Sequence, residues 1–134
     1  MKYVYFDASY RDGRAHLGVI ITEQKIRRNK VQGKAVRYAR GTTASGSFEA
    51  ELKAFQFASR IAQTLGIVEP VFFSDNQGLV SLVVRMKESL RKIRRNPLLM
   101  ALSPMIFPFF PREGFNMHWI PRSLNIQADA ITHP

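Results

Sequence analysis

The chain opens with four consecutive β-branched or aromatic residues, Tyr3-Val4-Tyr5-Phe6, and then reaches a carboxylate, Asp7. An unbroken apolar run suits a strand that is covered on both faces better than an alternating strand at a sheet edge. We therefore predict a central strand that ends at Asp7, with a sheet built around it. A buried strand gives one acidic group a rigid platform, so the positions of the other acids become the main question.

Two further strands are predicted in the first third of the sequence. Asp12-Gly13 is a strong hairpin-turn signal, and the chain returns through a β-branched run at residues 16–22. Residues 23–34 are highly charged, so we expect a turn and an exposed strand edge there, before a third strand over residues 34–40. Strands joined in this order form an antiparallel meander.

Helices and strands alternate in the rest of the chain. We predict a helix over residues 48–65, capped by Ser45 or Ser47 and closed by Gly66. The strand at residues 71–75 follows this helix, so a right-handed crossover would place it parallel to a strand already in the sheet. The later elements are a basic helix from residue 77 to 96, a short helix with irregular chain at 98–110, a strand at 115–120 and a short helix at 124–130.

The composition predicts one domain over residues 1–134. A chain of 134 residues with 46% hydrophobic residues can bury one core and is short for two. The absence of cysteine excludes disulfides and thiolate metal sites, and three scattered histidines predict no zinc site. No apolar run approaches the roughly 20 residues that cross a bilayer, and no signal sequence opens the chain. We expect a cytoplasmic monomer that needs neither a membrane nor a protein partner.

Basic residues are in large excess. Twenty Lys and Arg against ten Asp and Glu give a formal net charge of +10, which favours a polyanionic partner because each neutralised phosphate releases counterions. Charge alone leaves three interpretations open: a protein that binds nucleic acid, a protein that binds anionic lipid headgroups, and a protein that is merely basic. The densest cluster lies at residues 85–95, and we interpret it as a phosphate-facing ridge that includes Arg91, Arg94 and Arg95.

Four acids are distinguished by their positions. Asp7 and Asp75 each follow an apolar strand; on adjacent strands, about 4.8 Å apart, they would repel unless a cation lay between them. Glu49 shares the solvated face of the first helix, whereas Glu51 shares its apolar face, where a carboxylate needs a cation, a metal or hydrogen-bond donors. The alternative for Glu51 is an acid that favours the helix N-terminus. Asp129 lies in the last helix. Such oxygen ligands suit Mg²⁺ or Mn²⁺.

Short motifs around these acids follow one another along nearly the whole chain. They are Tyr5-Phe6-Asp7-Ala8-Ser9, the Thr42-Thr43 loop with Ala50-Glu51-Leu52-Lys53-Ala54, Phe73-Ser74-Asp75-Asn76-Gln77, and the run from His118-Trp119-Ile120-Pro121 to Ala128-Asp129. Each motif is weak alone, but in this order and spacing they resemble the ribonuclease H type 1 family, in particular its shorter branch with a reduced last loop.

The resemblance implies an α/β fold of the ribonuclease H type, with a five-stranded mixed sheet whose first three strands are antiparallel and helices on both faces. It implies endonucleolytic hydrolysis of the RNA strand of RNA/DNA hybrids by two divalent ions, leaving 5′-phosphate ends. The implied metal ligands are Asp7, Glu51, Asp75 and Asp129. The resemblance implies that Thr43, Ser45 and Gln77 lie along the hybrid and that Asn125 lies near the site. We count all four, together with Arg122, as candidate nucleic-acid-binding residues.

The chain departs from the family near its last helix. Many members carry a histidine in the preceding loop, which here is shortened to Pro121-Arg122-Ser123. Arg122 could meet a phosphate but cannot act as a base at neutral pH. The shortness of the final helix predicts that Asp129 is held loosely.

Two other functions stay open. The first is a nucleic-acid-binding module of the same fold that grips through residues 25–34 and 85–95 and cleaves weakly or not at all. Retention of all four acids argues against it, because a pure binder gains nothing from negative charge beside its phosphate ligand. The second is another nuclease of this fold, such as a junction resolvase or an exonuclease, and the ending with Asn125, Ala128 and Asp129 argues against it.

Overall fold

The computed structural model describes residues 2–94, 97 and 114–133, and for residues 89–94 it describes the backbone alone. Its elements in chain order are β1 (Tyr3–Arg11), β2 (Arg14–Thr22), β3 (Ala35–Thr43), α1 (Ser47–Thr64), β4 (Val71–Ser74), α2 (Gln77–Arg94), β5 (Asn116–Trp119), the 3₁₀ helix η1 (Arg122–Leu124) and α4 (Ile126–Ile131).

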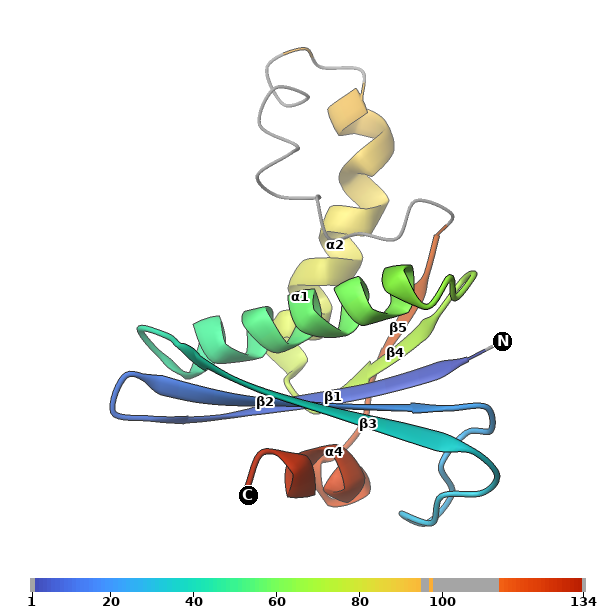
Figure 1. The fold of residues 1–134 in the computed structure, drawn as a ribbon. Coiled ribbons are helices and arrows are strands. Elements are labelled where there is room, and N and C mark those ends of the chain that lie inside the picture. Colours follow the sequence, from blue (N-terminus) through green and yellow to red (C-terminus); the bar gives the residue numbers. More distant parts are fainter. Residues whose placement is uncertain (1, 95–96, 98–113, 134) are drawn as a thin grey trace.

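The strands form one mixed sheet in the order β3-β2-β1-β4-β5. The β1–β2 and β2–β3 pairs are antiparallel, whereas β4 is parallel to both β1 and β5. Helices α1 and α2 lie on one side of the sheet and α4 on the other (Figure 1). The predicted fold is confirmed, including the antiparallel first three strands and the central position of β1.

The first strand is longer than its apolar run. Asp12 and Gly13 both adopt positive φ, 50° and 80°, and this tight turn lets the ladder with β2 continue to the pair Arg11↔Arg14. The prediction that the strand ends at Asp7 is therefore wrong on the β2 side. On the other side, pairing with β4 stops at Tyr5↔Phe73, so Asp7 lies where β1 has lost one of its two neighbours.

The two faces of the sheet carry different amounts of apolar packing. On the α1 side a large cluster includes Phe6, Phe55 and Phe72, whose rings contact one another at centroid distances of 5.3–6.4 Å. The α4 side has a smaller cluster around Tyr5 and Phe73, which stack at 4.6 Å. Most of the core therefore lies between the sheet and α1.

The first helix differs from its prediction at one end and agrees at the other. Its N-cap is Gly46, without a side-chain cap bond, so neither Ser45 nor Ser47 caps the helix. Ser45 instead donates its hydroxyl to the carboxylate of Glu49. At the other end Gly66 adopts φ +67° after the last turn, as expected for a residue that closes a helix.

Some predictions lie outside the described residues. The short helix and irregular chain expected at residues 98–110 fall there, as do Arg95 and the predicted helix end at residue 96. Within the described residues, none of the helices combines the length and apolar character needed to cross a membrane.

Candidate active site

Asp7 and Asp75 meet at the edge where β1 and β4 part. Two residues beyond the last ladder pair, Tyr5↔Phe73, the same register leads to Asp7 on one strand and Asp75 on the other. Asp75 is fixed by the Trp119 indole, whose Nε1 donates to its backbone oxygen at 3.1 Å. The prediction that parallel strands bring these two carboxylates to one edge is confirmed.

Asn76 lies between Asp75 and the first residue of α2, Gln77. Its Oδ1 accepts from the backbone N of Leu79 at 2.9 Å, which satisfies a donor of the first helical turn. The Ser74 hydroxyl accepts from the backbone N of Asn76 at 3.1 Å. The backbone on both sides of Asp75 is therefore held by side chains, so the position of its carboxylate is defined.

Glu51 reaches the same point from α1. It lies on the buried face of the helix, with 9% of its surface exposed. Asp7, Glu51 and Asp75 each offer one oxygen, and these oxygens all lie within 4.8 Å of one another. Glu49 points elsewhere and forms an ion pair of 3.2 Å with Lys53. The prediction that Glu51 lies on the buried face of the helix and Glu49 on its solvated face is thus confirmed.

The electrostatics of this trio are unfavourable without a cation. Burial, followed by the charge of Asp75, raises the pKa of Asp7 to about 7. Burial, followed by the charge of Asp7, raises the pKa of Glu51 to about 9. In addition, Oε2 of Glu51 is buried and has no hydrogen-bond partner among the described residues. A buried acceptor without a donor is costly, and a cation would relieve both problems.

The donor set fits a hard divalent cation. All three groups offer carboxylate oxygens, the ligands that Mg²⁺ and Mn²⁺ prefer over nitrogen or sulfur. The orphaned Glu51 oxygen is an observation of this chain that points the same way. The side chains lie in a cleft of about 490 Å³, which is also lined by Ser47, Arg122, Asp129 and His133.

Asp129 enters the cleft from the opposite face of the sheet. It lines the cleft without joining the trio within 4.8 Å, and its Oδ1 lies 3.3 Å from Nε2 of His133. The buried Thr132 donates its hydroxyl to the backbone oxygen of Asp129 at 2.7 Å, and Ser9 donates its hydroxyl to the backbone oxygen of Thr132 at 3.0 Å. The expectation that Asp129 is held loosely is therefore wrong, because its helix is tied to β1.

Gly18 is what allows α4 to come this close. It pairs with Asp7 in the β1–β2 ladder, and a Cβ built on it would lie 2.8 Å from the backbone oxygen of Ala128 and 2.8 Å from Cβ of Ile131. Any other residue would push the helix off the strand. The sequence contained this signal, since a lone glycine inside a β-branched strand often marks close backbone approach.

Asn125 lies near the site, as expected, but it is not exposed as a contact to the hybrid would be. It is buried, with 1% of its surface exposed. Its Nδ2 donates to the backbone oxygen of Phe6 at 3.0 Å and to Oδ2 of Asp75 at 3.1 Å. In this position Asn125 cannot touch a duplex. It orients a carboxylate of the trio instead.

Four of the other predicted nucleic-acid contacts are described with their side chains, and all four are exposed. Thr43 lies at the end of β3, Ser45 in the loop that follows it, and Gln77 at the start of α2. Arg122 lines the cleft itself. Arg91 and Arg94 belong to α2, but their side chains are not among those described. His133 was not predicted as a site residue, because nothing in its sequence neighbourhood relates it to Asp129 beyond helical spacing.

A family model described as reverse transcriptase-like matches residues 5–133, almost the whole chain. The chain belongs to the reverse transcriptase-like family. A search of curated protein sequences found no match to this chain. Solved structures of ribonucleases H share its fold.

The solved structures that match this chain include three of ribonuclease H. The RNase H1 of the halophilic archaeon Halobacterium salinarum is 18% identical, with a TM-score of 0.69 over 97% of this chain and 92% of that chain. LC11-RNase H1, solved in complex with an RNA/DNA hybrid, is 20% identical, with a TM-score of 0.65 over 98% and 93%. An N-terminal RNase H domain from Mycobacterium tuberculosis is 20% identical, with a TM-score of 0.58 over 97% and 88%.

Proposed function

We propose that this chain is a metal-dependent endoribonuclease that hydrolyses the RNA strand of RNA/DNA hybrids. The observation that carries the proposal is the carboxylate trio, with oxygens within 4.8 Å of one another and one buried oxygen without a partner. The family, the ribonuclease H fold and the net charge of +10 support the same activity. LC11-RNase H1, which shares the fold, was solved with an RNA/DNA hybrid.

The residues of the cleft divide into two roles. Asp7, Glu51 and Asp75, together with Asp129 from the facing wall, would hold two divalent ions, Mg²⁺ or Mn²⁺. Asn125 orients the carboxylate of Asp75 through a hydrogen bond of 3.1 Å to one of its oxygens. When bound, such a pair of ions activates the attacking water and stabilises charge on the leaving oxygen. Cleavage then leaves 3′-hydroxyl and 5′-phosphate ends.

A second set of residues, polar and basic, binds the hybrid. A hybrid presents 2′-hydroxyls in a wide, shallow minor groove, so recognition depends on backbone shape and on these hydroxyls. We assign this binding to Thr43, Ser45, Gln77 and Arg122, and phosphate contacts along α2 to Arg91, Arg94 and Arg95. The chain is proposed to act as a monomer.

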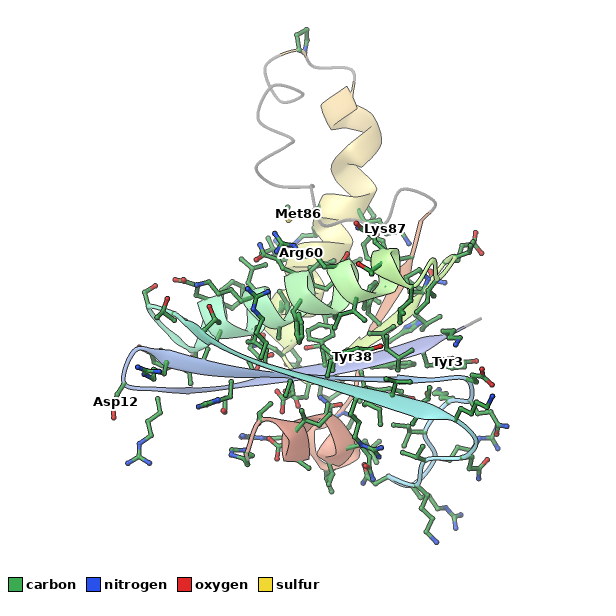
Figure 2. All side chains as sticks on the ribbon, in the orientation of Figure 1. Tyr3, Asp12, Tyr38, Arg60, Met86 and Lys87 are labelled. Carbon is green, nitrogen blue, oxygen red and sulfur yellow. The ribbon has the colours of Figure 1, made fainter. Side chains whose placement is uncertain are left out.

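The test compares the wild type with Asp7→Asn on labelled RNA/DNA hybrid, RNA duplex and single-stranded RNA, with Mg²⁺, Mn²⁺ or a chelator. We expect metal-dependent loss of only the hybrid's RNA strand, and at least a hundredfold loss of that activity in Asp7→Asn with hybrid binding retained. Asp12→Asn is a matched control, since Asp12 lies at the exposed β1–β2 turn (Figure 2) and asparagine tolerates its positive φ. Wild-type cleavage by Asp7→Asn would contradict the proposal, and tight binding without cleavage by the wild type would favour the binding module.

A further inference from the structure

A basic hairpin lies on the α4 side of the sheet, between β2 and β3 (Figure 1). Arg27 and Lys30 form a β-bridge, and the backbone N of Lys30 donates to the oxygen of Arg27 at 2.9 Å. The two residues between them, Arg28 and Asn29, adopt φ of 51° and 59°. Two consecutive positive φ values define the tight turn that hairpins use, usually with asparagine or glycine at both positions.

The hairpin is docked to the segment that carries the C-terminal half of the cleft. Asn29 donates from Nδ2 to the backbone oxygen of Ser123 at 2.7 Å, and its own backbone oxygen accepts from Nε2 of Gln127 at 2.8 Å. At the base of the hairpin, the backbone N of Ile26 donates to the Tyr5 hydroxyl at 2.9 Å. The turn is therefore held at its tip and at its base.

Three basic side chains leave this docked turn for solvent. We call Arg27, Arg28 and Lys30 the tip cluster; all three are exposed. None of them pairs with a carboxylate in the described part of the chain, where Glu23, the one acid of the segment, pairs with Lys2 at 3.6 Å. Arg28 also occupies a backbone conformation that costs an arginine about 1 kcal/mol. Local folding would favour asparagine or glycine at this position, so folding does not explain the arginine.

The turn that carries the tip cluster is docked one residue away from a residue of the cleft wall. Ser123, which accepts from Asn29, follows Arg122 directly, and Arg122 lines the cleft beside Asp7 and Asp75. Consecutive Cα atoms are 3.8 Å apart, so the docking point lies one residue from a wall of the cleft. A duplex carries one negative charge per about 1.7 Å of its axis, and a duplex seated at Arg122 therefore brings further phosphates within reach of the neighbouring turn.

We propose that the tip cluster is a second phosphate-binding surface, which extends the duplex interface from the cleft across the α4 side. The proposal rests on the proposed function only in naming an RNA/DNA hybrid as the duplex. It is separate from the α2 ridge, because α2 lies on the other side of the sheet (Figure 1). A rigid turn suits this task, since ordering a flexible basic loop on binding would cost conformational entropy.

The test measures hybrid binding by fluorescence anisotropy over a series of salt concentrations, with a chelator so that no cleavage occurs. Arg28→Asn removes a charge and gives the turn a residue that it prefers, so a folding defect is not expected; Lys30→Gln removes a second charge. Each lost phosphate contact should lower the slope of log affinity against log salt by about 0.9, or about 1.8 for the double variant. Arg60→Gln is the matched control, because Arg60 is exposed on the α1 side (Figure 2).

The outcomes separate this inference from the proposed function. An unchanged slope in the double variant, or an equal change in Arg60→Gln, overturns the tip cluster as a phosphate surface. A second measurement uses vesicles of anionic lipid. If the wild type binds them and the double variant does not, while both bind the hybrid equally well, the choice of nucleic acid as partner is overturned. If the slope falls as expected but the wild type cleaves no hybrid with metal present, the inference stands and the proposed function fails.

Discussion

The two faces of the sheet deliver their acids by different means. Glu51 comes from α1, which is fixed by the large aromatic cluster around Phe55. Asp129 comes from α4, where the apolar cluster is small and individual hydrogen bonds from Ser9, Asn29 and Asn125 fix the segment. Packing over many contacts tolerates the loss of one of them, whereas a few directional bonds do not. We therefore expect single substitutions to move Asp129 more readily than Glu51.

The strongest contrast between the faces should appear in the pH dependence of stability. The pKa values of Asp7 and Glu51 are raised by folding, so the unfolded chain releases these protons at lower pH than the folded chain. Their contribution to stability is full below about pH 4 and is lost as the pH rises through about 7 and 9. Metal-free protein should lose stability between pH 5 and 9, by an amount on the order of 2 kcal/mol or more.

Thermal unfolding with a chelator and with excess Mg²⁺ measures this dependence. Glu51→Gln should flatten the profile of the metal-free protein. Asp129→Asn should change the profile less, because the Asp129 side chain is 34% exposed. Because a metal binds the ionised carboxylates, stabilisation by Mg²⁺ should grow over the same pH range. A metal-free profile that is flat in the wild type would show that the trio is not buried as described.

Gly18→Val tests whether the α4 face depends on one close approach. The added Cβ would meet the backbone of Ala128 at 2.8 Å, so α4 should shift outward at a cost of about 1–3 kcal/mol. Hybrid cleavage should fall more than the stability loss explains, because Asp129 moves with the helix. Gly41→Val is the control, since a Cβ at Gly41 in β3 meets nothing within 4 Å. Equal effects of the two substitutions would remove the special role of Gly18.

Asn29→Gly probes the weaker tether on the same face. It removes the side-chain bond to Ser123 while glycine accepts the φ of 59°, so stability should fall by about 1 kcal/mol or less. Amide hydrogen exchange in η1 and α4 should accelerate, whereas exchange in α1 should stay unchanged. Uniform acceleration in both helices would indicate that the two faces unfold as one unit.

The sequence was sufficient to predict the trio, because each of its acids has a local signature. Asp7 and Asp75 follow apolar strands, and Glu51 falls on the apolar face of a periodic helix. These patterns depend on residues within a few positions of each acid, which is the range over which hydrophobic periodicity is informative. The element order then placed the three acids at one edge of a parallel pair.

The sequence was not sufficient for the α4 side, because its contacts join residues far apart in the chain. Ser9 and Thr132 are separated by 123 positions, and Asn29 and Ser123 by 94. No local pattern couples such pairs. The turn of residues 23–34 was also obscured, since Arg28 stands where hairpin rules expect asparagine or glycine. Asn125 was assigned to the duplex because a motif does not reveal burial.

The bond between Ser9 and Thr132 also has a consequence for biosynthesis. β1 leaves the ribosome before the other described elements, and the strands can begin to pair while later residues are still being added. The wall that carries Asp129 cannot close until residue 132 has emerged, because α4 docks on β1 and β2. The cleft is thus completed only after α4 has emerged, so the fourth carboxylate is the last of the set to become available during synthesis.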